Sequence, residues 1–469
     1  MRPHSFLLRA NLLPAHSNLL PARSRIVAVL AALLSCALAL PVGGVATAAP
    51  LGKFTTFRLG DGGYGGNAIA SGPDGNMWFT NNANNSIGRI TPSGTVTYFK
   101  VPTDPSLSYG AGLFAITAGP DGNIWFTGFY ASTVGKVTPD GQVTTYPLPL
   151  EEAYPLGITA GPDGNVWFTL DSANGIGRIT PAGKVRLFST DGAPVVAAPA
   201  CVMCGYYITA GPLDSLWFTM PTAGLVGRMT TRGDVSTFPV PTATDQATSD
   251  TAVLGAITAG VDGNLWITQN ADGKITRMTP KGAVTDFDLP SATSLPSSIA
   301  PGPDASLWVA ESGSGALARV DISGAKAPVT ITQLPIPTDN STPVSVALGT
   351  NGSVWFTNIV LPPGQPGTIK LQVGRVGTGV GPLVTAKVKG TPQPGARLTC
   401  AYASTQAAVE GTVHYQWFRD GKPMRREDAR RFTVRPDDTG DAISCRVSVT
   451  YLTALYQLAG TSAPVKIRR

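Results

Sequence analysis

Long apolar runs are scarce in this chain of 469 residues. The stretch from Ile26 to Leu40 has 15 residues, too few for a comfortable membrane-spanning helix of about 20. No other segment is long and apolar enough, so the sequence predicts no membrane span. Acidic residues are absent from residues 1–48, where four arginines precede the apolar stretch and Ala46-Thr47-Ala48 follows it. This order is typical of a secretory signal, and we expect residues 1–48 to be removed and the protein to be secreted, with cell-surface association as a further possibility.

Histidine is nearly missing. The chain has three, at His4, His16 and His414. Two lie in the expected signal and the third lies near the C-terminus, so residues 49–383 contain none. A histidine-based acid–base pair or metal site is thereby excluded from that stretch.

Cysteine is also rare, with five in the chain. Cys36 leaves with the signal. Cys201 and Cys204 are separated by two residues, and in an exported chain we predict a local disulfide between them rather than a redox catalyst or half of a zinc site.

Charge is sparse and unevenly distributed. The whole chain has a formal charge of +6, but residues 49–383 carry −5 and residues 384–469 carry +7. A basic appendage on a mildly acidic body favours contact with anionic polymers or surfaces, although a solvated face is the simpler interpretation. Nothing in this distribution predicts nucleic-acid binding.

One short phrase, written "AITAGPDGNIWFT" at residues 115–127, recurs along most of the chain. Each copy contains one tryptophan, and consecutive tryptophans are 42 to 50 residues apart. Eleven residues after each of the first six comes a basic residue. The tryptophans are Trp78, Trp125, Trp167, Trp217, Trp266, Trp308 and Trp355. A period of 40 to 50 residues indicates a solenoid or a propeller.

The chemistry within each repeat favours the propeller. Two β-rich runs flank Pro120-Asp121-Gly122, and the next pair flanks Thr138-Pro139-Asp140-Gly141. Both are turn sequences, so each repeat reads as four antiparallel strands without a helical segment. Four-stranded sheets repeated radially form a β-propeller, here with seven blades. The repeated Asp-Gly pairs are better explained as turns than as calcium ligands, and we expect the tryptophans to pack between blades.

The ring also needs to be closed. A fourth strand is readable in six repeats but not after Arg375, whereas residues 54–59, ahead of the first full repeat, have the character of such a strand. We predict that they complete the last blade.

The C-terminal segment differs in kind. Cys400, Trp417 and Cys445 are spaced like the disulfide and the packed tryptophan of an immunoglobulin-type sandwich. The predicted fold is therefore all-β, with a seven-bladed propeller followed by a small immunoglobulin-like sandwich. The predicted boundaries are a signal at 1–48, the propeller at 49–376, a linker at 377–384 and the sandwich at 385–469.

The phrases "ITAGPDGNxWFT" and "IGRITP" resemble the streptogramin lyase (virginiamycin B lyase) family of seven-bladed propellers over about residues 53–376. The resemblance implies a carbon–oxygen lyase that linearises cyclic antibiotics by elimination, with a site at one mouth of the channel. It further implies a histidine as acid or base and a magnesium ion held by acidic and histidine ligands.

Carrying these residues over one by one leaves little of that site. The positions that match the family histidine hold no histidine; they are Asn67, Phe114, Leu156, Tyr206, Gly255, Ser297 and Val344. The family acid after the tryptophan is matched only by Glu311, in the copy whose histidine position is Ser297. Asp171 comes one residue later in its own copy. We therefore leave the catalytic residues unassigned and predict no cofactor, with magnesium expected only if a lyase activity exists.

Two functions remain open. The first is an exported binding or scaffold protein that takes a small molecule, a sugar or a peptide at the propeller mouth. The second is a weak or altered lyase using Glu311. The mouth residues predicted to bind a ligand are Asn67, Asn81, Phe114, Leu156, Tyr206 and Glu311.

Arginines are concentrated in the predicted sandwich, five of them within eleven positions. Several nearby guanidinium groups suit repeated phosphate or carboxylate groups. We predict weak, salt-dependent binding of an anionic cell-wall polymer by Arg425, Arg426, Arg430, Arg431 and Arg435.

Overall fold

The computed structural model describes residues 49–468 with gaps at 62–67, 106, 108–109, 193–194, 196–205, 242–253, 325–328, 362–368, 381–383, 405–410, 425–426 and 452–456. Within these residues the chain is all-β, and its helical segments are two single 3₁₀ turns, Pro221–Ala223 and Pro436–Asp438. The described residues include no helix long and apolar enough to span a bilayer.

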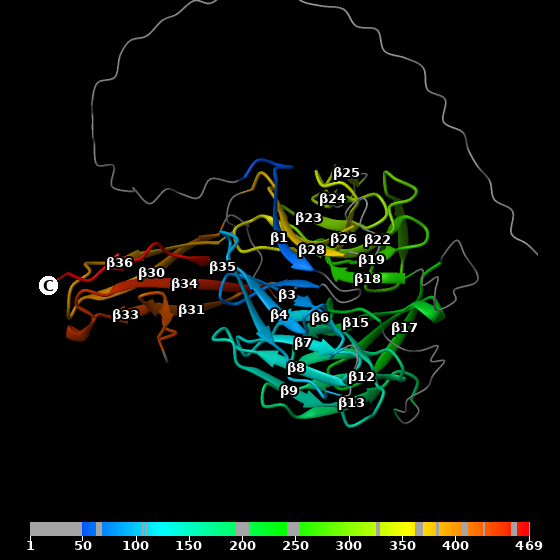
Figure 1. Cartoon of the computed structure of the whole chain (residues 1–469), viewed down its shortest axis with the longest axis horizontal. Helices are drawn as coiled ribbons and strands as arrows, with labels where there is room; N and C mark the ends of the chain where they lie inside the picture. Colours follow the sequence, from blue (N-terminus) through cyan, green and yellow to red (C-terminus); the bar gives the residue numbers. More distant parts are fainter. Residues whose placement is uncertain are drawn as a thin grey trace, which may run out of the picture. The chain divides into compact units, whose positions relative to one another are not determined.

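Seven four-stranded antiparallel sheets are formed by the described part of residues 54–376 (Figure 1). We call them blades 1 to 7 in chain order. Blade 1 has β2(Ile69–Ser71), β3(Met77–Asn81), β4(Ser86–Ile90) and β5(Val96–Lys100). Blade 2 has β6(Leu113–Ala118), β7(Ile124–Gly128), β8(Thr133–Val137) and β9(Val143–Pro147). Blade 3 has β10(Pro155–Ala160), β11(Val166–Leu170), β12(Gly175–Ile179) and β13(Val185–Ser189).

Blades 4 to 6 follow the same order of strands. They are β14(Ile208–Gly211), β15(Ser215–Met220), β16(Leu225–Thr230) and β17(Val235–Pro239); β18(Leu254–Ala259), β19(Leu265–Gln269), β20(Lys274–Met278) and β21(Val284–Asp288); and β22(Pro296–Pro301), β23(Ser306–Glu311), β24(Ala316–Asp321) and β25(Thr330–Pro335). Blade 7 has β26(Ser341–Leu348), β27(Val354–Val360) and β28(Lys370–Val376), with β1(Phe54–Asp61) as its outer strand.

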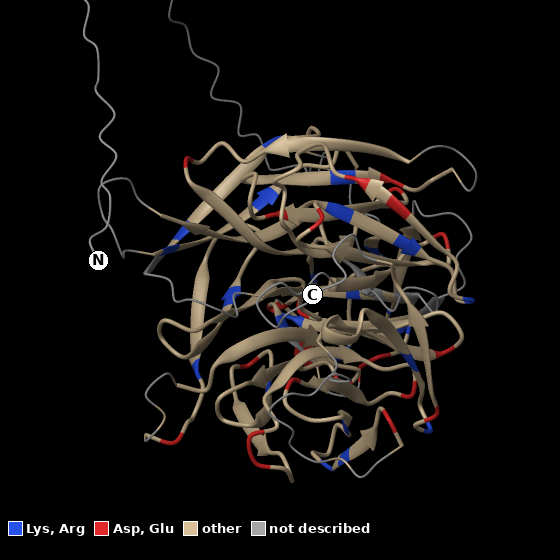
Figure 2. Cartoon of the chain, turned by 90° about the vertical axis from the view of Figure 1, so that its right-hand side faces the viewer, with Lys and Arg blue, Asp and Glu red and all other residues tan. Residues whose placement is uncertain are grey.

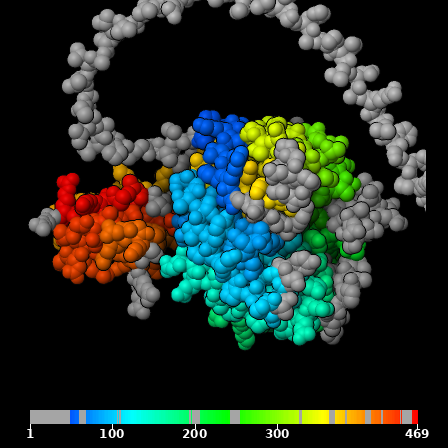
Figure 3. All heavy atoms as spheres, in the orientation of Figure 1, coloured from blue at the N-terminus to red at the C-terminus, as the bar shows by residue number. Residues whose placement is uncertain are grey.

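The pairing of β1 with β28 confirms the predicted closure. Phe54 lies opposite Val376 and Phe57 opposite Val373, in antiparallel register. The first strand of each blade contacts the first strand of the next, and β26 contacts β2 in turn, so the blades form a closed ring. Figure 2, turned by 90°, shows the sheets around this ring, and Figure 3 shows the same chain as atoms.

The repeated tryptophans are fully or almost fully buried and pack between neighbouring blades, as predicted. Trp78, for example, shares a cluster with Ile116 and Phe126 of blade 2. The turn aspartate holds the indole in place, since Trp78 Nε1 donates to Asp74 Oδ1 at 2.9 Å. The same bond recurs at Trp125 and Trp167. These carboxylates therefore accept hydrogen bonds from the buried tryptophans, in agreement with the interpretation of the Asp-Gly pairs as turns.

The basic residue of the repeat joins one blade to the next. Arg89 lies over the Trp78 ring at 5.6 Å and donates to the carbonyl of Pro139 in the following blade at 2.8 Å. Lys136 makes the equivalent contact with Pro181, and Arg375 closes the series with Pro92 of blade 1. The spacing of eleven residues is thus explained by a contact between blades.

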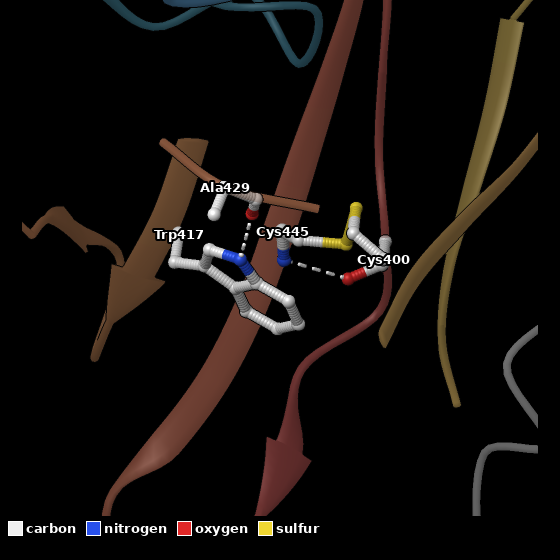
Figure 4. The surroundings of a disulfide bond; sticks show 5 residues. Cys400, Trp417, Ala429 and Cys445 are labelled. Carbon is white, nitrogen blue, oxygen red and sulfur yellow. Dashed lines mark hydrogen bonds between the residues drawn. A yellow bond between two sulfur atoms is a disulfide. The ribbon is translucent and has the colours of Figure 1, made fainter. Parts of the chain in front are cut away.

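Residues 384–468 form two antiparallel sheets. One contains β29(Val384–Lys389), β30(Arg397–Ser404) and β33(Arg431–Thr433); the other contains β31(Gly411–Arg419), β32(Lys422–Pro423), β34(Ala442–Tyr451), β35(Gln457–Thr461) and β36(Val465–Lys466). A disulfide joins Cys400 of the first sheet to Cys445 of the second, and Trp417 lies beside it (Figure 4). Trp417 Nε1 donates to the carbonyl of Ala429 at 2.8 Å. The segment is a two-sheet sandwich; its assignment as immunoglobulin-like stays a prediction.

Candidate functional site

The first strand of every blade begins at the same edge of the ring, which we call the upper face. The Pro-Asp-Gly turns lie at the opposite edge, the lower face. At the upper face the buried threonine of each Trp-Phe-Thr motif fixes the backbone. Thr127 Oγ1 accepts from the amide of Ala115 at 3.0 Å and donates to the carbonyl of Leu156 at 2.9 Å. Thr169 reaches the carbonyl of Tyr206 in the same way, at 2.7 Å.

These threonines explain why the mouth positions are well defined. Thr80, Thr127 and Thr169 each bond to the backbone carbonyl of the mouth residue in the following blade: Phe114, Leu156 and Tyr206. In blade 6, Ser297 plays a comparable part, because its hydroxyl lies 3.1 Å from the carbonyl of Pro343 in blade 7. The residue at the family's histidine position in this copy is therefore engaged in joining blades.

Aromatic side chains gather at the upper face of blades 2 to 4. Phe129, directly after β7, stacks on Tyr154 with ring centroids 4.9 Å apart and 18° between the planes. The Phe114 ring is tilted against Phe129 with centroids 6.4 Å apart, and Tyr130 meets Phe129 edge-on at 5.2 Å. The rings come from two blades, so their meeting depends on how neighbouring blades are set in the ring.

An acidic group borders these rings. Asp171 follows β11, and its backbone amide donates to the carbonyl of Tyr154 at 3.0 Å. Burial raises the pKa of the Asp171 carboxyl. The backbone carbonyl of Tyr206 accepts from Thr169, two residues before Asp171. Burial, and then the Asp171 charge, raise the pKa of Tyr206. We call Phe114, Phe129, Tyr154, Asp171 and Tyr206 the upper-face arc.

The backbone at Tyr154 is held in an unusual conformation. Its φ is +46°, and Glu152 two residues earlier has a φ of +52°. A bulky residue with positive φ costs on the order of 1–3 kcal/mol and persists only where its surroundings fix it. The stack on Phe129 and the bond from Asp171 are two contacts that hold Tyr154 in this position.

Tyr207 follows the arc along the chain. Its ring lies 5.6 Å from that of Tyr206, and burial raises its pKa to about 12. It packs against the hydrophobic clusters between blades 4, 5 and 6. Its phenol is therefore neutral at physiological pH and belongs to the wall rather than to the arc.

Blades 5 to 7 have a different upper edge. In these blades the third residue after the tryptophan is a polar side chain buried inside the blade: Gln269, Glu311 and Asn358. Glu311 Oε2 accepts hydrogen bonds from Ser314 Oγ, at 2.7 Å, and from Gln333 Nε2. Gln269 donates to Thr276, which donates to Asp286 at 2.7 Å. These side chains run along the blade toward its outer strand.

The predicted ligand-binding residues accordingly fall into three groups. Phe114 and Tyr206 lie in the upper-face arc and are partly exposed. Leu156 is 2% exposed, Asn81 1% and Glu311 0%, so these three side chains are buried, and their role in ligand binding stays a prediction. Asn81 and Glu311 end strands in which every residue is buried, and Leu156 lies in the buried part of β10. Asn67 lies outside the described residues.

Three members of the arc were not predicted as ligand-binding residues: Phe129, Tyr154 and Asp171. Each lies just beyond a strand end, where the repeat no longer constrains the sequence. The only available signal was the enrichment of aromatic residues in the loops that flank blade 2 and blade 3.

A separate cavity of about 600 Å³ opens at the lower ends of the first strands. Thr117, Thr159 and Pro301 line it together with His414. The chain's one histidine outside the expected signal thus lies at the end of the channel opposite to the arc. The described residues that line this cavity include no Asp, Glu, Lys or Arg.

The remaining predicted sites lie outside the propeller or outside the described residues. Arg430, Arg431 and Arg435 are exposed, and Arg435 pairs with Glu427. Arg425 and Arg426 lie outside the described residues, as do Cys201 and Cys204. The polymer contact and the second disulfide stay predictions.

Comparison with known proteins shows the family to which the propeller is related. The model of the virginiamycin B lyase family matches residues 39–247 and 196–377. A comparison with curated proteins returned no match.

Three solved structures are similar to the chain, each with a TM-score of 0.56. A streptogramin B lyase is 30% identical over 68% of this chain and 97% of its own. Virginiamycin B lyase from Staphylococcus aureus is 29% identical over 69% of this chain and 99% of its own. A catalytically inactive variant of that enzyme, with a histidine replaced by alanine and with quinupristin, is 28% identical over 69% of this chain and 100% of its own. The chain belongs to the virginiamycin B lyase family.

Proposed function

We propose that this chain is an exported binding protein, in which the lyase-family propeller holds a small ligand on its upper-face arc. The observation that carries the proposal is the arc itself: stacked rings beside a partly buried acid, at the mouth of a propeller without histidine. Aromatic faces with a few placed polar groups are the usual composition of a small-molecule site. The S. aureus relative that lacks one histidine is described as inactive, which supports binding without turnover here.

A magnesium-dependent elimination does not fit the described residues. Glu311 already accepts two hydrogen bonds on one oxygen, and the donors are an amide and a hydroxyl rather than a second acid. Among the described residues no three His, Cys, Asp or Glu side chains come together as a metal site would need. We therefore derive no catalytic step through a metal.

The test separates binding from turnover. The chain from residue 49 onward is incubated with a streptogramin B antibiotic and Mg²⁺, and linear product is followed by mass spectrometry. We expect no product above the buffer control, together with ligand binding that Tyr154→Leu weakens. Turnover that is lost in Glu311→Gln would overturn the proposal in favour of the second candidate, a lyase with altered chemistry, which family membership favours.

Attachment to the cell surface is a separate part of the proposal. The arginines of the sandwich support weak binding to an anionic wall polymer, with Arg435 contributing least because Glu427 already pairs with it. Pull-down of the whole chain by cell-wall material across a salt series tests this. Retention that does not fall with salt would contradict an electrostatic contact.

A further inference from the structure

The upper-face arc differs from an ordinary aromatic surface in its charge. Between residues 101 and 260 every lysine and arginine lies within a third strand, in the turn after it, or at the start of the fourth: Lys136, Arg178, Lys184, Arg186, Arg228 and Arg232. The third-to-fourth turns are at the lower face. Among the described residues, the upper edge of blades 2 to 4 therefore has no lysine or arginine, whereas it has Glu151, Glu152 and Asp171.

Asp171 is the central charge of this edge. It is partly buried, and no lysine or arginine of the described residues forms an ion pair with it. An acid that loses hydration without gaining a cation is held at a cost by the fold, as its raised pKa shows. A cation supplied from outside would remove that cost.

The rings beside Asp171 supply the second half of a cation site. The carbonyl of Tyr154 accepts from the amide of Asp171, and the Tyr154 ring stacks on Phe129. The Asp171 charge also raises the pKa of Tyr206 in the next blade, after the larger effect of burial. The negative faces of aromatic rings attract organic cations, and alkylammonium groups gain most because they are weakly hydrated. Rings and carboxylate thus favour the same kind of ligand.

We infer that the upper-face arc binds the alkylammonium group of a small cationic molecule, with Asp171 as the counter-ion and Phe129, Tyr154 and Tyr206 as the enclosing rings. The inference rests on the proposed function, because it names the ligand class of the same site. Sugars and neutral peptides, which the mouth alone would also admit, become the weaker ligands.

A matched pair of probes tests the charge directly. Choline and its neutral isostere 3,3-dimethyl-1-butanol have nearly the same shape, and binding of each to the chain from residue 49 onward is followed by NMR titration. We expect choline to bind at least about tenfold more tightly. N-acetyl-lysine amide forms a third arm, which distinguishes a peptide side chain from a small quaternary amine; we expect it to bind more weakly than choline.

Three variants locate the site. Asp171→Asn should lower choline affinity about tenfold and leave the isostere unchanged, whereas Tyr154→Leu should weaken both. Asp140→Asn is the control, because Asp140 is an exposed acid in a lower-face turn of blade 2. Thermal unfolding of each variant shows that the fold is retained.

The outcomes separate the two claims. Equal binding of choline and its isostere, or an unchanged choline affinity in Asp171→Asn, would overturn the cation inference while leaving a binding site in place. Absence of binding by all three probes, and of any effect of Tyr154→Leu on any ligand, would remove the binding function as well.

Discussion

Two parts of the upper face, in blade 3 and in blade 6, are built from the same repeat, and each has one acid near the end of its second strand. The position of that acid relative to the tryptophan differs by one residue. In blade 6 the acid is Glu311, three residues after the tryptophan; in blade 3 it is Asp171, four residues after. Glu311 is the last residue of β23, a strand in which every residue is buried, and is 0% exposed, whereas Asp171 lies beyond the end of β11 and is partly exposed. The same chemical group is structural in one blade and available to a ligand in the other.

Placing an acid in blade 3 at the position that corresponds to Glu311 should have the largest effect on stability. Leu170 is fully buried and packs with Ile158, Val166 and Phe168. Leu170→Glu places a carboxylate there without hydrogen-bond donors, and we expect a loss of about 3–5 kcal/mol in the free energy of unfolding. Urea denaturation measures it, with Leu170→Met as the control at under about 1.5 kcal/mol. An unchanged midpoint would show that this strand end is not part of the core.

Removing the acid of blade 6 should have a smaller effect. Glu311→Ala leaves Gln333 and Ser314 without their acceptor, at a cost of about 1–3 kcal/mol. Glu311→Gln retains a carbonyl acceptor and should cost less than half of that. Ligand affinity at the upper-face arc should be the same in both variants, and a large loss of affinity would show that the two halves of the mouth act together.

The partly buried position of Asp171 should make the stability of the protein depend on pH. Its pKa is raised in the folded state by burial, so its charged form opposes folding at neutral pH. As pH falls through the raised pKa to the ordinary aspartate value, that opposition disappears. Asp171→Asn should therefore be more stable than the parent chain at neutral pH, with the difference vanishing at low pH. A difference that grows on acidification would reverse the assignment.

The smallest expected effect on stability concerns Tyr154. Tyr154→Asn relieves the positive φ, which asparagine tolerates, but loses the stack on Phe129, worth about 0.5–1.5 kcal/mol. We expect the free energy of unfolding to change by less than about 1 kcal/mol while ligand affinity falls clearly. A strongly destabilised variant would mean that Tyr154 serves the fold first.

The repeat made the framework readable from sequence. Tryptophan spacing, turn chemistry and the missing fourth strand after Arg375 were enough to predict the blades and the strand of residues 54–59 that completes the last one. The function of the basic residue, which lies over the Trp ring and bonds to the next blade, was not predicted, because it depends on the angle between blades.

The site was less accessible to sequence reasoning. Phe129 and Tyr154 meet across two blades, and no periodicity predicts which loop residues will touch. Glu311 matched the family motif, yet its carboxylate is held by Gln333, a residue of the outer strand 22 positions away. Motif position indicates the strand end but not the hydrogen bonds that decide where the side chain lies.

The pairing of β1 with β28 has a consequence for how the chain folds. Residues 54–61 are made early, yet their partners at 370–376 come more than 300 residues later. Six blades can assemble from neighbouring hairpins as they are synthesised, but the seventh has to wait for a contact of very high sequence separation, which is slow to form. Until then both ends of the ring expose unpaired strand edges, the condition in which β-proteins associate wrongly. Completion of the last blade is therefore the step at which the propeller becomes a closed, protected molecule.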